Sequence, residues 1–335
     1  MVPFDAKRSA ARSTSRWGLV LRGIVLTLAL VFVAHGVDWR DIAHTLGRAG
    51  FALPAVVVGM NACMMGLRAM RLRVLLQGRI TFTSAFAALL TSSALNNITP
   101  LRGGNVARLW MLERSAGVTK SAAVAVMLVE NLLEITVLAV LGFCASWFTH
   151  GQRWATVATP VVFAAAVAVL VMLHLRAGRA ADFADADPQA LGWLARLRRF
   201  LVRLEPGFHA LSKPGVAALA LVLSLLAWTC EATMILICAL SVDLQISFPL
   251  AVVALLGINF ALALPSTPSS AGPFEGATVA VLLLAGFSKA PALAFAIFYH
   301  AIQVIPVTLT GITVVLLAKR RRAQPTDRAP QVFVT

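Results

Sequence analysis

Apolar segments close to 20 residues long recur from one end of the chain to the other, and they limit the fold more than any other feature. An α-helix rises about 1.5 Å per residue, so roughly 20 apolar residues cross the ~30 Å hydrocarbon core of a bilayer. Full spans are predicted at about 17–36, 49–67, 119–146, 154–175, 215–241 and 290–318. Only 13% of the 335 residues are charged, about half of the roughly 25% typical of soluble domains. The sequence therefore predicts an all-α polytopic membrane protein.

Two further apolar segments are interrupted. Residues 83–99 and 249–264 are each followed by a Pro/Gly-rich break and a shorter helical segment, at 105–114 and 274–287. A helix of about ten residues is roughly 15 Å long, too short to cross the bilayer. We therefore expect two re-entrant or broken helical hairpins, with a pair of short spans as the alternative in each case.

Basic residues orient the predicted spans, because Lys and Arg collect on the cytoplasmic side of membrane proteins. They are dense in the N-terminal segment 1–16, the connection 177–213 and the tail 319–335. We expect one transmembrane domain over 17–318 with both termini in the cytoplasm. The connection is expected to contain an amphipathic helix on the leaflet surface, with an ordinary loop on the positively charged cytoplasmic side as the alternative.

Arg68 and Arg71 follow the predicted end of the second span. We interpret them mainly as interfacial side chains that extend to the headgroup region. The formal net charge of +15 reflects the same insertion bias, and no nucleic-acid partner is predicted.

The chain contains an internal repeat. An offset of 169 residues places Gly117 on Gly286, Lys120 on Lys289 and Glu130 on Tyr299. The repeat units cover about 49–146 and 215–318, and three predicted spans separate their starts, so the copies insert in opposite orientations. An inverted repeat with interrupted apolar segments at matching positions is typical of transporters.

Polar and charged residues at membrane depth are the candidate site, because each is expensive there unless it faces protein or water. Glu130 and Glu134 lie one helical turn apart on one face. Arginines in the same region could bind a phosphate through two parallel hydrogen bonds, and a purely structural ion pair is the alternative for the glutamates. The predicted substrate-binding residues are Asn96, Asn97, Pro100, Arg102, Gly103, Arg108, Glu130, Glu134, Glu231, Gly272, Glu275, Tyr299 and His300.

Enzyme signatures are absent from the sequence. It has no HExxH, GxSxG, P-loop or dinucleotide-binding motif, and its four cysteines lack metal or redox spacing. We therefore predict no catalytic residue, metal or cofactor.

Three stretches carry a resemblance to a known family: NNITPLRGGNVAR at 96–108, GVTKSAAVAVMLVEN at 117–131 and PSTPSSAGPFEG at 265–276. Together they resemble the membrane region of lysylphosphatidylglycerol synthases, a flippase-like family of bacterial inner-membrane proteins, over about 17–318. Some members are associated with hopanoid biosynthesis. The resemblance implies two re-entrant segments and translocation of a lipid headgroup across the inner membrane. By motif position it points to Pro100, Arg102, Gly103, Arg108, Glu130, Gly272 and Glu275.

Two departures from the family pattern qualify this resemblance. The family often has Glu after the first glycine of the first break, where this chain has Gly104 and Asn105. Lysylphosphatidylglycerol synthases also carry a soluble C-terminal aminoacyl-transferase domain, whereas 17 residues follow the last predicted span here. We therefore do not expect this chain to perform that transfer itself.

The function expected from the sequence is transport of an anionic or isoprenoid-type lipid between leaflets. A non-transporting membrane partner of a lipid pathway, such as hopanoid biosynthesis, is the first alternative. An integral-membrane lipid-modifying enzyme is the second. Self-association as a homo-oligomer is left open.

Overall fold

The computed structural model describes residues 52–99, 103–148, 212–263 and 268–323. These ranges contain α-helices and one short 3-10 turn, and no strand. The elements are α3 (Ala52–Leu75), α4 (Phe82–Ile98), α5 (Gly104–Ala116), α6 (Lys120–Phe148), α9 (Pro214–Leu240), α10 (Phe248–Ala263), η4 (Pro268–Ser270), α11 (Pro273–Leu284) and α12 (Lys289–Ala323). The all-α membrane-protein class is confirmed.

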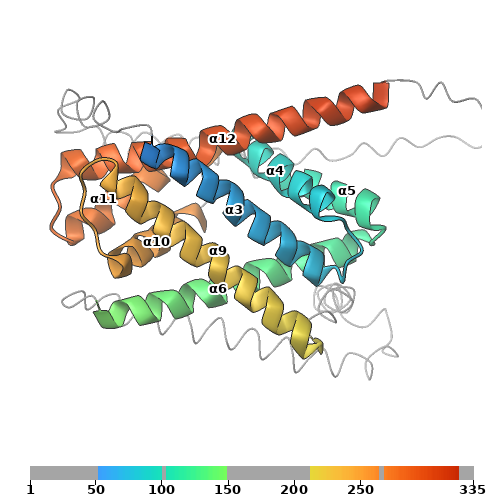
Figure 1. The fold of residues 1–335 in the computed structure, drawn as a ribbon, viewed down its shortest axis with the longest axis horizontal. Helices are drawn as coiled ribbons and strands as arrows, with labels where there is room; N and C mark the ends of the chain where they lie inside the picture. Colours follow the sequence, from blue (N-terminus) through green and yellow to red (C-terminus); the bar gives the residue numbers. More distant parts are fainter. Residues whose placement is uncertain (1–51, 100–102, 149–211, 264–267, 324–335) are drawn as a thin grey trace, which may run out of the picture.

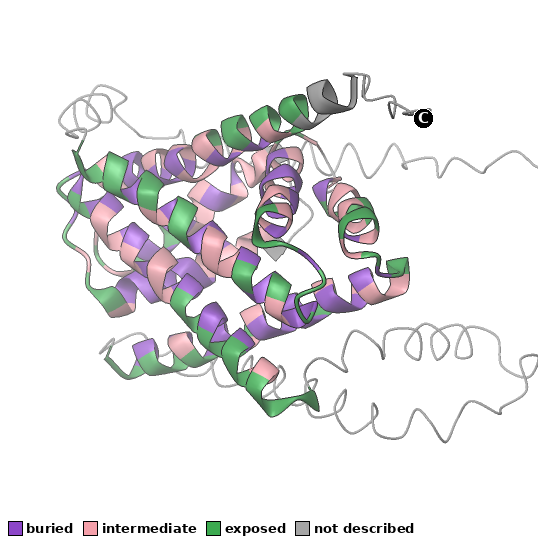
Figure 2. Cartoon of the chain, turned by 45° about the vertical axis from the view of Figure 1, so that its right-hand side comes forward, coloured by how far each residue is buried: buried purple, intermediate pink, exposed green. Residues whose placement is uncertain are grey.

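Among the described residues, four helices are long and apolar enough to cross a membrane: α3, α6, α9 and α12. They match four of the six predicted spans. The predicted spans 17–36 and 154–175, the N-terminal segment 1–16 and nearly all of the connection 177–213 and the tail 319–335 lie outside the described residues. The exposed large hydrophobic residues lie mostly on the long helices, and Figure 2 shows exposed residues along their outward faces.

The largest difference from the predicted boundaries is in α3. It continues to Leu75, whereas the predicted span ends at residue 67. Arg68 and Arg71 therefore lie inside the helix. Hydropathy alone would end the helix before them. Their charges are compensated by side chains of other helices, so the helix does not have to end where they occur.

The short helices match the interrupted segments. Helices α4 and α5 have 17 and 13 residues, and α10 and α11 have 16 and 12. The second break ends at a proline and a glycine. Pro273 starts α11 at the first helical position, and Gly272 precedes it at φ 91°. Proline suits that position because its missing N–H would be unpaired there anyway.

The described helices form two sets of four in the same order, α3–α6 and α9–α12. Each helix of the first set corresponds to the helix at the same place in the second set, and corresponding pairs pack in the same way. Helix α4 packs on α12, and its counterpart α10 packs on α6. Helix α5 packs on α6, and its counterpart α11 packs on α12. Helices α3 and α9 pack against each other and run in opposite directions (Figure 1). This arrangement is what the predicted repeat requires.

Glycines permit the closest helix contacts. A Cβ at Gly311 of α12 would lie 2.5 Å from the Leu90 carbonyl oxygen and from the Ala94 Cβ of α4. A Cβ at Gly104 would overlap the Ser92 carbonyl oxygen of α4. The packing of α5 on α4 therefore leaves no room for a side chain at position 104 of this chain.

Candidate functional site

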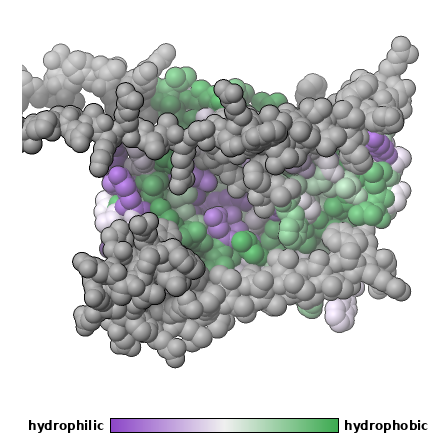
Figure 3. All heavy atoms as spheres, turned by 180° about the vertical axis from the view of Figure 1, so that it is seen from behind, coloured by the Kyte–Doolittle hydropathy of each residue, from purple (hydrophilic) through white to green (hydrophobic). Residues whose placement is uncertain are grey.

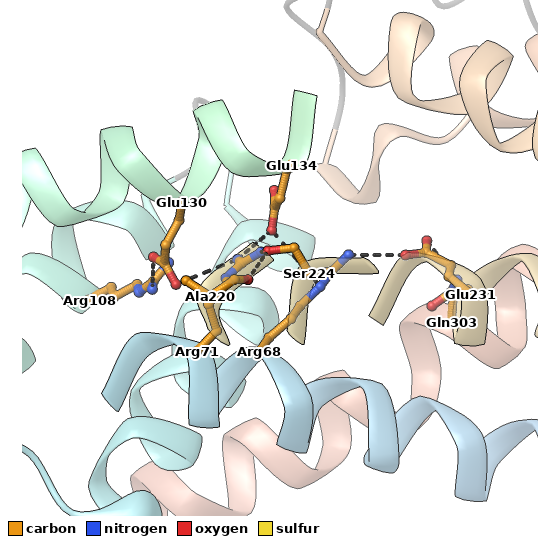
Figure 4. A network of polar contacts seen from close by, with 9 residues as sticks. All are labelled: Arg68, Arg71, Arg108, Glu130, Glu134, Ala220, Ser224, Glu231 and Gln303. Atoms are coloured by element: carbon orange, nitrogen blue, oxygen red, sulfur yellow. Dashed lines mark hydrogen bonds and ion pairs between the residues drawn. The ribbon is translucent and has the colours of Figure 1, made fainter. Parts of the chain in front are cut away.

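Three arginines and three glutamates form one ion-pair network at the centre of the helix bundle (Figure 4). Arg68 and Arg71 come from α3, Arg108 from α5, Glu130 and Glu134 from α6, and Glu231 from α9. The charges sum to zero. Spanning helices can hold such residues only when each charge has a partner, because an isolated charge in a low-dielectric interior is costly.

Arg71 is the centre of the network, with 2% of its surface exposed. Its Nη2 donates to Glu134 Oε1 at 2.7 Å and lies 3.6 Å from Glu130 Oε1. Its Nη1 donates to the Ser224 hydroxyl of α9 at 3.0 Å. Glu130 also accepts a hydrogen bond from Arg108. One guanidinium thus connects α3 with α6 and α9, and α5 joins through Glu130.

Arg68 extends the network along α3. Its Nη2 donates to Glu231 Oε2 at 3.0 Å, and its Nε lies 4.0 Å from Glu134 Oε1. The guanidinium also lies over the Trp228 ring, 5.2 Å from the ring centre, a favourable position for a cation on a π-system. The ion pair between Arg68 and Glu231 joins the two four-helix sets directly.

Neutral polar side chains continue the network into α12. Gln303 Nε2 donates to Glu231 Oε1 at 3.4 Å and to the Tyr299 hydroxyl at 2.6 Å. Asn61 Nδ2 of α3 donates to Gln303 Oε1 at 3.0 Å. By the repeat offset, Tyr299 and Gln303 stand where the first half has Glu130 and Glu134. The first half therefore carries the charged version of a pattern that is neutral in the second half.

The network retains unused hydrogen-bonding capacity. Within the described residues, the buried Nε atoms of Arg68, Arg71 and Arg108 and the Oε1 atom of Glu130 have no hydrogen-bond partner. Three guanidinium N–H groups therefore lack an acceptor among the described residues. Figure 3 shows hydrophilic side chains in the middle of one face of the protein, between hydrophobic ones.

A second polar group lies at the break before α11. Glu275 Oε1 lies 2.5 Å from His300 Nδ1, and Glu275 Oε2 accepts from the Gly272 N–H at 2.7 Å. His300 Nε2 lies 3.0 Å from the Ser269 carbonyl oxygen. The carboxylate caps the N-terminus of α11, where a negative charge is favoured by the helix dipole.

The structure divides the predicted site residues between these two places. Arg108, Glu130, Glu134, Glu231 and Tyr299 belong to the central network, whereas Gly272, Glu275 and His300 meet at the second break.

The remaining predicted residues belong to the first break. Asn96 donates to Asn105, Asn97 donates to Thr308 of α12, and Gly103 precedes the first residue of α5. Pro100 and Arg102 lie outside the described residues.

The interpretation of Arg68 and Arg71 as mainly interfacial residues is wrong. Both lie within α3 and pair with glutamates, and Arg71 is buried. A usable signal was present, because the apolar pattern resumes after Arg71 and the two arginines lie three residues apart on one helix face. Ser224, Gln303 and Asn61 were also missed, since single neutral polar residues in apolar helices give no distinctive pattern.

Comparison with known proteins identifies the family of the chain. Residues 19–311 match the family described as the lysylphosphatidylglycerol synthase TM region. The chain is also 22% identical over 226 residues to a UPF0104 membrane protein of Methanocaldococcus jannaschii, an alignment that covers 68% of this chain and 94% of that protein. The resemblance inferred from the two breaks and the Glu130 helix is thereby confirmed. The chain is a membrane protein that belongs to the family of the lysylphosphatidylglycerol synthase TM region.

Proposed function

We propose that this protein moves a lipid with an anionic headgroup between the leaflets of the inner membrane. The observation that carries the proposal is the buried ion-pair network, in which three arginines have an Nε–H without an acceptor among the described residues. Arginine binds phosphate oxygens through several N–H groups at once, and a site of low dielectric strengthens such bonds. A headgroup phosphate is the ligand that this set of donors fits.

The glutamates act as internal counter-ions in this proposal. They neutralise the arginines when no lipid is bound, and a headgroup phosphate replaces them as the arginine partner when a lipid enters. Arg108 is the first contact, because it comes from the short helix α5 next to the first break and pairs with Glu130. Arg68 is the next, since its side chain is 21% exposed.

The two four-helix sets supply the movement. Helix α5 has 13 residues, roughly 20 Å of helix, which is shorter than the ~30 Å core. This length supports re-entry of the α4–α5 and α10–α11 hairpins from opposite faces. Irregular backbone at membrane depth is tolerated where it is packed in protein or lines a wet cavity. Rocking of one set against the other about the Arg68–Glu231 pair would expose the network to each leaflet in turn.

The test is lipid exchange between leaflets in proteoliposomes. Fluorescent phosphatidylglycerol and phosphatidylcholine report the anionic and the zwitterionic headgroup, and a membrane-impermeant quencher measures the outer leaflet. Arg108→Ala and Glu130→Gln are expected to slow exchange of the anionic lipid by tenfold or more, on the order of 1.4 kcal/mol in the barrier. Glu113→Gln removes a half-exposed acid near the end of α5, whose partner is Lys120 outside the network, and serves as the matched control.

Equal rates for the wild type and both variants would rule out a role for the network in transport. Absence of any exchange, together with co-purification of another membrane protein, would instead favour a non-transporting partner of a lipid pathway. Mass spectrometry of lipids extracted from the purified protein distinguishes a phospholipid from an isoprenoid phosphate.

A further inference from the structure

The second break contains more hydrogen-bond acceptors than a neutral histidine can serve. His300 has one ring nitrogen 2.5 Å from a Glu275 carboxylate oxygen and the other 3.0 Å from the Ser269 carbonyl oxygen. A neutral imidazole carries a single N–H. It can therefore donate to one of these two acceptors, and its other nitrogen would present a lone pair to an oxygen lone pair.

An additional proton resolves this conflict. With the proton on the ring, both nitrogens donate, one to the carboxylate and one to the carbonyl. With the proton on Glu275 Oε1, the carboxylic acid donates to Nδ1, and Nε2–H donates to Ser269. In either form, the pair holds one proton more than a neutral histidine beside a carboxylate. The other oxygen of Glu275 is occupied by the Gly272 N–H, so it does not offer an alternative place for the proton.

The surroundings of the pair favour the proton-bound form. The His300 ring stacks on Phe274, with ring centres 4.3 Å apart and an angle of 16° between the planes, and a π-face is favourable to positive charge. Only 10% of the His300 side chain and 13% of the Glu275 side chain are exposed. Water therefore does little to replace the hydrogen bonds that the proton makes.

The ionisable groups on the neighbouring helices have other partners or lie further along their helices. Helices α4 and α10 carry no ionisable side chain, and α11 carries Glu275 alone. Helix α12 contributes Tyr299, which accepts from Gln303, Lys289 at its start and the basic residues 319–322 near its far end. The remaining groups are Cys63, Arg68, Arg71 and Arg73 of α3 and Cys230, Glu231 and Cys238 of α9; Arg68 pairs with Glu231, and Arg71 with Glu134.

The backbone of this break is strained. Ser269 and Ser270 have φ values of 54° and 61°, in the left-handed region that non-glycine residues rarely occupy. Such strain persists only when the surrounding structure holds it. His300 binds the Ser269 carbonyl and Glu275 binds the Gly272 N–H, so the pair holds the turn near both ends.

We propose that His300 and Glu275 form a proton-binding site that holds the turn of residues 269–272 in place. When the proton is bound, the turn of residues 269–272 is tied to α11 and α12. When the proton leaves to water, one of the three contacts that the pair makes becomes repulsive, and the strained turn separates from α12. The site belongs to one half alone, because the repeat places Val106 and the exposed Asn131 at the positions of Glu275 and His300. The proposal does not depend on which lipid is transported or on transport itself.

The test is backbone hydrogen exchange of the full chain in lipid nanodiscs, followed between about pH 5 and about pH 9. The rates of the peptide covering 268–276 are corrected for intrinsic amide chemistry. In the wild type, protection of this peptide is expected to fall by about tenfold through a one-proton transition as pH rises, since a charge-assisted hydrogen bond is lost. The ¹⁵N spectrum of His300, assigned with His300→Ala, reports the proton itself.

Two variants give opposite results under the proposal. In Glu275→Gln, the amide donates to Nδ1 in place of the proton while its oxygen accepts from Gly272, so the break stays protected at every pH. In His300→Ala, the turn loses its attachment and exchanges rapidly at every pH. Glu113→Gln, which removes a half-exposed acid elsewhere, should follow the wild type.

Three results would overturn the proposal. One is protection that does not change with pH in the wild type. Another is a Glu275→Gln protein that titrates like the wild type. The third is a His300 spectrum of a neutral ring across the whole range.

Discussion

At the scale of single residues, Arg71 determines how the network is organised. It is a cation inside a spanning helix that contacts two glutamates and a serine from two other helices. Removal of one member of a buried ion pair leaves the other charge without compensation, which is more damaging than removal of both. Arg73 is two residues further along the same helix but exposed, so it provides a direct comparison.

Arg71→Met is expected to lower the stability of the protein in detergent by about 3–5 kcal/mol. The substitution removes a positive charge that neutralises Glu130 and Glu134. Arg73→Met should change stability by less than about 0.5 kcal/mol. The midpoint of thermal unfolding, followed by fluorescence, measures both. Addition of Glu134→Gln to Arg71→Met should recover part of the loss. No recovery in the double variant would mean that Arg71 stabilises the protein by packing rather than by charge.

At the scale of helices, two kinds of glycine occur in the apolar segments. Gly311 lies where α12 touches the backbone of α4, and an added Cβ would meet the Leu90 carbonyl. Gly59 lies in α3 with open space around its Cα. The sequence does not distinguish these two positions, because both are glycines in apolar helices.

Gly311→Ala is expected to destabilise the protein by about 1–3 kcal/mol, since it forces α12 away from α4. Gly59→Ala should leave stability unchanged or raise it by up to about 1 kcal/mol through better helix propensity. Thermal unfolding of the two purified variants tests this difference. Equal effects of the two substitutions would show that α12 and α4 are further apart at Gly311 than in the structure.

At the scale of the whole molecule, the basic ends of the spanning helices lie on one side. The end of α3, the starts of α6 and α9 and the end of α12 all lie toward the right of Figure 1. Lys213, just before α9, donates to Gln77, just after α3, at 3.1 Å. Because basic residues face the cytoplasm, we expect this side to be cytoplasmic.

Cysteine labelling in whole cells tests that orientation. In a cysteine-free background, Ser115→Cys at the basic end should react with an impermeant reagent only after the cells are opened. Gln245→Cys, in the exposed loop after α9, should react from outside. Asn105→Cys near the first break should react from the cytoplasmic side if the α4–α5 hairpin re-enters from there. Labelling of Asn105→Cys from outside alone would contradict that re-entry.

Much of the fold could be predicted because it follows from local patterns. The four described spans, the interrupted segments and the helix order all follow from apolar length, from Pro and Gly positions and from the repeat. Bilayer thickness sets the length of a spanning helix, and unpaired backbone groups are excluded from lipid. Glu130, Glu134 and Glu231 could be named as site residues for the same reason, since charge is rare in such segments.

The partners of those residues were decided by the tertiary structure. Arg68 and Arg71 look like the end of a helix in the sequence, and only the packing of α6 and α9 against α3 makes them buried network members. The placement of Glu275 on His300 rather than on an arginine likewise depends on how α11 meets α12. The sequence alone determined that the chain is an apolar helical repeat with two breaks, because those properties depend on neighbours along the chain. Helix packing decided which charged residues pair with each other. The paired residues are up to 163 positions apart in the chain, so neighbours along the sequence do not determine the pairs.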